Sequence, residues 1–217
     1  MAAGTETLAY VFRPGTAPRA PALLALHGTG GDELDMLPLA SAVAPGTPVL
    51  SPRGAVREGA ANRWFRRFAE GVFDLDDLRR RAADLSAWIA AARQEHRDAL
   101  AGRPLVAIGY SNGANIAAAM LLAGHGGAVD AAILLRAQHT LDAAAGLDLL
   151  GLPVLLASGV TDPVVPAPEA ARLAATLKAA GAAVTHETIP AGHGLDTRDV
   201  ALAKRFLEGL AAAAAPG

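Results

Sequence analysis

A glycine-rich segment near the middle of the chain has the residue types that can expose a reactive serine. Residues 109–113 read G-Y-S-N-G and fit the pattern G-x-S-x-G, in which a sharp turn between a strand and a helix raises the serine hydroxyl above a sheet. The apolar run before this segment predicts the strand, and the small and apolar residues 114–122 predict the helix. Glycines two positions before and after the serine avoid side-chain clashes in so tight a turn. Ser111 is therefore the candidate nucleophile, and the alternative is an ordinary glycine-rich turn.

A serine nucleophile needs a base that removes its proton and a carboxylate that orients the base. Asp162 follows the apolar run Val154–Ser158, and His193, flanked by glycines, follows the run Val184–Ile189. Both runs predict buried strands, so both side chains are expected just beyond strand ends. Taken singly, an aspartate before a proline is usually a turn former, and a glycine-flanked histidine is often a loop residue. The order serine, aspartate, histidine and the three strand-end positions together predict a catalytic triad.

Two further carboxylates, Asp196 and Asp199, compete with Asp162 for the role of the acid in this triad. They follow His193 closely, at the start of the last predicted helix. Helix capping and the helix dipole account for negative charge at that position. Asp162 does not lie at the start of a predicted helix and so has no capping role, and the proline after it stiffens the turn that would hold it. The sequence therefore favours Asp162.

A second glycine-rich segment, Leu26–Glu33, reads L-H-G-T-G-G-D-E and follows an early apolar run. A loop in this place can aim a backbone N–H group at an oxyanion, because glycines let the backbone turn. The alternative is a dinucleotide-binding loop. That alternative requires a glycine where Glu33 stands and an acidic residue about 20 residues further on, whereas residues 46–56 contain no carboxylate.

Strands and helices are expected to alternate along most of the chain. Short apolar runs predict buried strands at Ala22–His27, Pro48–Ser51, Leu105–Tyr110, Ala131–Leu135, Val154–Ser158 and Val184–Ile189, with a further strand at Leu8–Phe12. Helical spacing of apolar residues predicts helices at Asp74–Gln94, Glu169–Ala180 and Thr197–Leu210. This alternation favours an α/β fold, in which helices cover both faces of a mainly parallel sheet. No linker or internal repeat divides the sequence, so residues 1–217 are expected to form one domain.

The composition excludes several classes of protein. The chain contains no cysteine, which removes disulfide scaffolds, thiolate metal sites and thiol nucleophiles. The histidines show no metal-binding spacing such as H-E-x-x-H, so neither a metal nor a cofactor is expected. The formal net charge of −2 gives no basic field for nucleic acid or for a membrane surface. The N-terminal residues do not resemble a signal peptide, and the long uncharged stretch 104–129 contains polar residues, so we expect a cytoplasmic protein without a membrane span.

The segment 62–73, which we expect to be a loop, contains four of the nine aromatic residues of the chain, interleaved with arginines. Trp64, Phe65 and Phe68 either anchor a surface loop or form a wall of the substrate pocket, where large apolar side chains would exclude water. Stacking on nucleic-acid bases is a third interpretation, which the net charge of −2 disfavours.

These motifs resemble those of the phospholipase/carboxylesterase branch of the α/β-hydrolase fold, which includes acyl-protein thioesterases and small bacterial carboxylesterases. The resemblance covers almost the whole chain and rests on L-H-G-T-G-G-D-E from Leu26, S-P-R-G from Ser51, G-Y-S-N-G-A-N-I-A from Gly109, D-P-V-V-P from Asp162 and G-H-G-L from Gly192. It implies that Ser111 is the nucleophile, Asp162 the acid and His193 the base. It also implies that the backbone N–H groups of Thr29 and Asn112 form the oxyanion hole.

The sequence departs from the better-known thioesterases at Asn112, where they have glutamine, and at Ala114, where they have glycine. Our main hypothesis is a serine esterase, free of cofactors, that cleaves small carboxylic esters or thioesters. The alternatives are a lysophospholipase or an acyl-protein thioesterase and, in another class, a catalytically silent binding protein with a hydrolase fold. Relatives of this branch are often dimers, so a homodimer is compatible with the resemblance, although the sequence itself does not give the oligomeric state.

Overall fold

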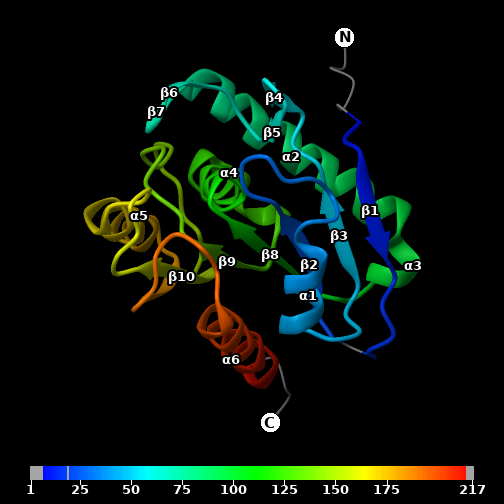
Figure 1. Cartoon of the computed structure of the whole chain (residues 1–217). Coiled ribbons are helices and arrows are strands. Elements are labelled where there is room, and N and C mark those ends of the chain that lie inside the picture. Colours follow the sequence, from blue (N-terminus) through cyan, green and yellow to red (C-terminus); the bar gives the residue numbers. More distant parts are fainter. Residues whose placement is uncertain (1–6, 19, 214–217) are drawn as a thin grey trace.

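A seven-stranded sheet forms the centre of the structure, a computed structural model that describes residues 7–18 and 20–213 (Figure 1). Its strands stand in the order β1 (Tyr10–Arg13), β3 (Val49–Pro52), β2 (Ala22–Leu26), β8 (Leu105–Tyr110), β9 (Ala131–Leu135), β10 (Pro153–Gly159) and β11 (Ala183–Ile189). β1 pairs antiparallel with β3 at one edge, and the other neighbouring pairs in this sheet are parallel. The predicted α/β fold with a mainly parallel sheet is confirmed.

The apolar runs of the sequence form the central strands because these strands are covered on both faces. All five residues of β2 and all five of β9 are buried, so neither face tolerates a polar position. β11 lies at an edge and is largely exposed, which is why its sequence mixes polar and apolar residues. The strand expected at Leu8–Phe12 is β1, which begins two residues later than predicted.

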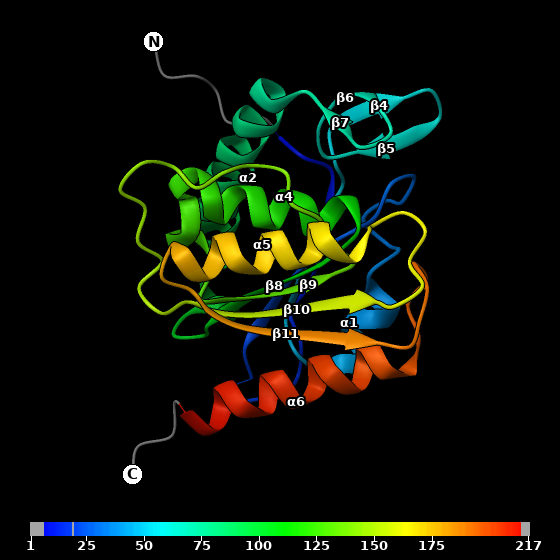
Figure 2. The same cartoon turned by 90° about the vertical axis from the view of Figure 1, so that its left-hand side faces the viewer.

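Helices cover both faces of the sheet (Figure 2). One face carries α2 (Leu75–Glu95), α4 (Asn112–Met120) and α5 (Ala167–Ala179), and the other carries α1 (Leu37–Val43) and α6 (Thr197–Ala213). A short helix, α3 (Arg97–Leu100), follows α2, while a π-helical turn (Leu121–His125) and a 3-10 turn (Gly126–Ala128) follow α4. The three long helices predicted from apolar spacing are confirmed, with boundaries that differ by a few residues.

The segment 62–73 is not the loop that we expected, because short hairpins run through it. β4 (Val56–Glu58) pairs with β5 (Ala61–Arg63), and β6 (Arg67–Ala69) pairs with β7 (Val72–Phe73). Each hairpin turns through a glycine with positive φ, Gly59 at 59° and Gly71 at 71°, and glycine adopts such angles without steric cost. Both hairpins lie above the end of the sheet toward which the arrows of β10 and β11 point in Figure 2.

Two further findings bear on the expected class of protein. Within residues 7–18 and 20–213, no helix is both long enough and apolar enough to cross a membrane. In the same part of the chain, no group of three or more histidine, aspartate or glutamate side chains is placed to hold a metal ion. The cytoplasmic location stays a prediction.

Leu134→Ala should destabilise the fold by about 2–5 kcal/mol, because it opens a cavity where β9 is covered on both faces. Leu134 is 0% exposed and belongs to the core between the sheet and α2, α4 and α5. The matched control is Leu150→Ala, since Leu150 is 86% exposed and its truncation should change stability by less than about 0.5 kcal/mol. Urea unfolding of both variants checks this expectation, and equal losses would contradict it.

Candidate active site

Ser111 alone forms the turn between β8 and α4. β8 ends at Tyr110 and α4 begins at Asn112. Ser111 has φ 50° and ψ −113°, a conformation that is costly for a residue with a side chain. Two backbone hydrogen bonds hold it there: its N–H donates to the carbonyl of Leu135 at 2.8 Å, and its carbonyl accepts from the N–H of Asn115 at 2.8 Å. The predicted strand–turn–helix around Ser111 is confirmed.

The glycines on either side of Ser111 allow this turn to pack against neighbouring backbone. A Cβ atom on Gly113 would collide with the backbone carbonyls of Leu26 and His27, so α4 can lie against the end of β2 only without a side chain there. A Cβ atom on Gly109 would lie 2.6 Å from the carbonyl oxygen of Gly113. The glycine spacing in G-x-S-x-G is therefore required by close backbone approach.

The structure brings Ser111, Asp162 and His193 together in one line of hydrogen bonds. His193 Nε2 lies 2.9 Å from Ser111 Oγ, and His193 Nδ1 lies 2.9 Å and 3.1 Å from the two carboxylate oxygens of Asp162. An ionised carboxylate only accepts hydrogen bonds, so Nδ1 carries the proton when the imidazole is neutral. Nε2 then has a free lone pair that faces the serine hydroxyl.

Asp162 stays ionised because donors surround its carboxylate. Burial alone would raise its pKa, but the backbone N–H groups of Val165 and Val164 and the imidazole of His193 lower it, and the net shift of the pKa is downward. The two N–H groups donate to Oδ1 at 3.0 Å and 2.8 Å. The carboxylate can therefore both orient the imidazole and stabilise its protonated form.

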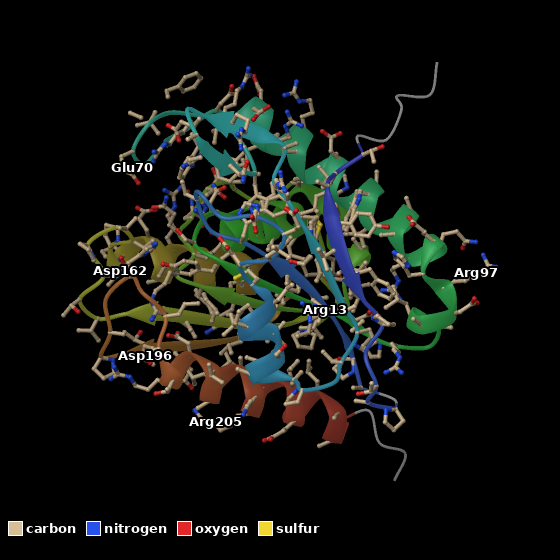
Figure 3. All side chains as sticks on the ribbon, turned by 45° about the vertical axis from the view of Figure 1, so that its right-hand side comes forward. Arg13, Glu70, Arg97, Asp162, Asp196 and Arg205 are labelled. Carbon is tan, nitrogen blue, oxygen red and sulfur yellow. The ribbon has the colours of Figure 1, made fainter. Side chains whose placement is uncertain are left out.

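The two competing carboxylates have other partners. Asp196 caps the start of α6, since its side chain accepts the N–H of Arg198 and forms an exposed ion pair with that arginine. Asp199 is buried and pairs with Arg136. Figure 3 labels Asp162 and Asp196, which lie at the same end of the sheet but on separate loops. Helix capping and the helix dipole, which the sequence offered as the explanation of Asp196 and Asp199, do not account for the pairing of Asp199 with a buried arginine.

The loop after β2 packs directly against the serine turn. His27 is buried, which lowers its pKa, and the N–H of Gly54 donates to its Nε2 at 2.9 Å. His27 is therefore neutral, and its Nδ1–H donates to the carbonyl of Gly28 at 2.7 Å. This bond fixes the backbone just before Thr29. Asn112, the first residue of α4, has a backbone N–H without a partner inside the helix.

Residues 62–64 connect the serine turn to the loop after β2. The backbone N–H of Trp64 donates to Oδ1 of Asn112 at 2.8 Å, and its indole N–H donates to the carbonyl of His27 at 2.8 Å. The amide of Asn62 donates to the carbonyl of Gly31 at 2.8 Å. The Asn112 side chain thus holds a neighbouring segment, while the sequence singled out only its backbone.

The three aromatic residues predicted as pocket walls lie in different environments. Trp64 and Phe65 are 3% and 0% exposed, so each offers a substrate almost no surface in this conformation. Trp64 instead bonds to Asn112 and His27, and the ring of Phe65 packs edge-on against that of Phe73. Phe68 is 76% exposed on the β6–β7 hairpin, and its role as a pocket wall stays a prediction.

Two hollows flank the site. One of about 350 Å³ is lined by Gly28, Thr29, Gly31, Asp35, Met36, Leu39, Tyr110 and Leu195, and therefore adjoins both the loop after β2 and the residue before Ser111. The other, of about 680 Å³, lies between the β6–β7 hairpin, residues 138–142 and the start of α5. Of the two, the first hollow lies closer to Ser111 along the chain, because Tyr110 lines it.

Comparison with known proteins shows which family the chain belongs to. The profile of the dienelactone hydrolase family matches residues 8–214, almost the whole chain. The chain belongs to the dienelactone hydrolase family. This agrees with the motif-based resemblance to carboxylesterases of the α/β-hydrolase fold, and it specifies the family within that fold. The protein is a hydrolase of the dienelactone hydrolase and carboxylesterase type.

Individual relatives of this dienelactone hydrolase family member point the same way. Putative hydrolase MhqD of Bacillus subtilis (strain 168) is 36% identical over 200 residues, which cover 91% of this chain and 96% of that protein. The crystal structure of a Bacillus cereus carboxylesterase is 40% identical, has a TM-score of 0.86 and covers 92% of each chain. A carboxylesterase from Mesorhizobium loti is 32% identical with a TM-score of 0.82, over 90% of this chain and 91% of that chain.

Gly113→Ala should lower the free energy of unfolding by about 1–3 kcal/mol, because the added methyl group forces α4 away from β2. The matched control is Gly127→Ala, since a Cβ atom there meets no atom within 4 Å and should cause no loss. Thermal and urea unfolding of the two variants measure the difference. A Gly113→Ala protein as stable as the control would show that close backbone approach does not constrain this position.

Proposed function

We propose that this family member is a serine carboxylesterase that cleaves small carboxylic esters through a covalent acyl-enzyme. The observation that carries the proposal is the series of hydrogen bonds that connects Asp162 to His193 and His193 to Ser111. The 2.9 Å between His193 Nε2 and Ser111 Oγ is within reach of proton transfer. Two relatives with solved structures are named carboxylesterases, which supports the same reaction class. Thioesters are the second acyl class that the same groups would serve.

In the first half of the reaction, Ser111 becomes acylated. His193 Nε2 accepts the hydroxyl proton while Ser111 Oγ attacks the carbonyl carbon of the ester. Asp162 stabilises the imidazolium that forms, and the backbone N–H groups of Thr29 and Asn112 donate to the oxyanion. When the carbonyl re-forms, the bond to the alcohol oxygen breaks and His193 gives its proton to that oxygen. The acyl group then remains on Ser111 Oγ.

In the second half, water releases the acid. His193 Nε2 removes a proton from a water molecule as the water oxygen attacks the acyl carbon, and the same N–H groups bind the new oxyanion. Collapse of this intermediate breaks the bond to Ser111 Oγ, which recovers its proton from His193. The carboxylic acid leaves, and the enzyme returns to its starting state without a metal ion or cofactor in the sequence of steps.

The hollow beside Thr29 supports a preference for small substrates. Its volume of about 350 Å³ lies near the lower end of the about 300–1,000 Å³ that ligand sites usually have. Met36, Leu39 and Leu195 provide apolar surface there, which suits a short acyl or alcohol group.

Ser111→Ala should reduce turnover by about 10⁴-fold or more, because it removes the atom that carries the acyl group. The measurement is hydrolysis of p-nitrophenyl acetate, together with labelling by a fluorophosphonate probe, which should modify Ser111 in the wild-type protein. Ser41→Ala, on the exposed side of α1, is the matched control and should retain full activity. Labelling at another residue, or an active Ser111→Ala protein, would disprove the mechanism.

Asp162→Asn should reduce turnover by up to about 10⁴-fold with little change of the fold, because an amide favours the wrong tautomer of His193. Asp196→Asn is the matched control, since its carboxylate pairs with exposed Arg198 and should affect only helix stability, by about 0.5–2 kcal/mol. Steady-state kinetics and melting temperatures of the two variants separate these effects. If Asp196→Asn were inactive and Asp162→Asn nearly normal, Asp196 and not Asp162 would be the acid of the triad.

A further inference from the structure

We propose that the buried pair Arg136–Asp199 positions His193 for catalysis by holding the backbone of the loop that carries it. Arg136 directly follows β9, and Asp199 lies in the first turn of α6. Neither residue touches the reacting atoms, so both would be positioning residues. The inference rests on the proposed function of His193 as the base.

The guanidinium of Arg136 binds the carbonyl groups on both sides of His193. Its Nε donates to the carbonyl oxygen of Gly192 at 2.8 Å, and its Nη2 donates to that of Gly194 at 3.2 Å. The two Nη atoms also donate to the two carboxylate oxygens of Asp199, at 2.8 Å and 3.0 Å. A fifth bond, from Nη1 to the carbonyl of Ala157 at 3.4 Å, ties the same group to β10. All five N–H donors of an arginine are therefore in use.

Burial shows that this pair is not an incidental surface contact. The side chains of Arg136 and Asp199 are both 0% exposed. A buried charge is strongly unfavourable unless it is paired and hydrogen-bonded, and here each charge neutralises the other. Asp199 also accepts the backbone N–H of Asp196 at 2.9 Å, so it fixes the chain further along the same loop.

The loop needs such support because of its own sequence. Glycines flank His193 on both sides, and a glycine backbone samples many conformations unless something restrains it. The carbonyl of His193 accepts from the hydroxyl of Tyr110 at 3.3 Å, and that of Ala191 accepts from the N–H of Thr161 at 3.1 Å. Together with the two bonds from Arg136, these bonds mean that the carbonyls of residues 191–194 all accept hydrogen bonds from groups outside the loop.

Arg136 is also connected to the nucleophile through the backbone. The preceding residue, Leu135, accepts the N–H of Ser111 at 2.8 Å. Arg136 itself has a φ of 57°, an unfavourable conformation for a residue with a side chain, and its N–H donates to the carbonyl of Ala157 at 2.9 Å. This backbone turn directs the guanidinium toward the His193 loop. One short segment therefore holds the backbone of Ser111 and that of His193.

A purely structural role makes a different prediction from a positioning role. If the pair only stabilises the fold, activity should follow the melting temperature in every variant. If it positions His193, activity should stay low whenever the bonds to Gly192 and Gly194 are absent, even in a well-folded protein. A displacement of about 1 Å in a catalytic group can reduce the rate by about 10²-fold.

The decisive variant is the double substitution R136M/D199N, compared with D199N alone. The single variant leaves Arg136 charged without a counter-ion, whereas the double variant removes both charges, so its melting temperature should recover relative to the single variant. Its kcat should nevertheless stay up to about 10²-fold below that of the wild type, with KM little changed, because methionine cannot bind the two carbonyls. The matched control R198M/D196N removes the exposed ion pair of the same region and should keep wild-type kcat.

Arg136→Lys provides a second test that does not depend on the double variant folding. Lysine keeps the positive charge beside Asp199, but its single ammonium group cannot span Gly192, Gly194 and the carboxylate at once. We expect a lower kcat for p-nitrophenyl acetate and faster hydrogen exchange of the backbone amides of residues 190–196. Recovery of kcat together with melting temperature in R136M/D199N would overturn the inference, as would wild-type kcat and exchange in Arg136→Lys.

The two proposals fail in different ways. If the wild-type protein and Ser111→Ala hydrolyse no ester of any acyl length, the proposed function is wrong. The exchange measurement on Arg136→Lys then still decides whether Arg136 holds the loop, since it does not require activity. If instead the wild type is active and Ser111→Ala is not, kinetics and exchange together test the positioning role alone.

Discussion

Ser111 lies between a strand that ends one residue before it and a helix that begins one residue after it, and the whole site depends on this single-residue turn. The turn forces α4 against the end of β2, which only a glycine at position 113 permits. The same contact brings the loop after β2 beside Ser111. The backbone turn at Ser111 and the close contact at Gly113 therefore set the spacing of α4, β2 and the loop after β2.

Side chains, most of them from other parts of the chain, hold the loops of the site in place by donating hydrogen bonds to their backbone carbonyls. Carbonyls in the loops after β2 and β11 accept bonds from four side chains that have no step in the proposed mechanism: His27, Trp64, Tyr110 and Arg136. Loops lack the regular hydrogen bonds of strands and helices, so each buried polar group must find another donor or acceptor. The polar residues around the site meet this requirement and at the same time restrict the loops to one conformation.

The sequence was sufficient to predict the strands of the central sheet, the long helices and the three residues Ser111, Asp162 and His193, which the structure joins by hydrogen bonds. Those features depend on local patterns: apolar runs, helical spacing and side chains placed just after strands. The partners of Asp199 and Asn112 were not predicted, because Arg136 and Trp64 are distant in sequence and lack a repeating pattern. A charged residue directly after the buried strand Ala131–Leu135 was the available signal. The hairpins at 56–73 were missed because strands of two or three residues are too short to form an apolar run.

The order of these pieces along the chain has a consequence for biosynthesis. Ser111 and His193 are 82 residues apart, and the helix that contributes Asp199 is the last element described. Protein chains emerge from the ribosome N-terminus first, so Ser111 and the loop after β2 are made well before His193. A nascent chain that ends at α5 contains Ser111 but not yet His193. In the proposed mechanism, hydrolysis therefore begins only when β11 and the loop that follows it have joined the fold, and a chain terminated before His193 would be inert.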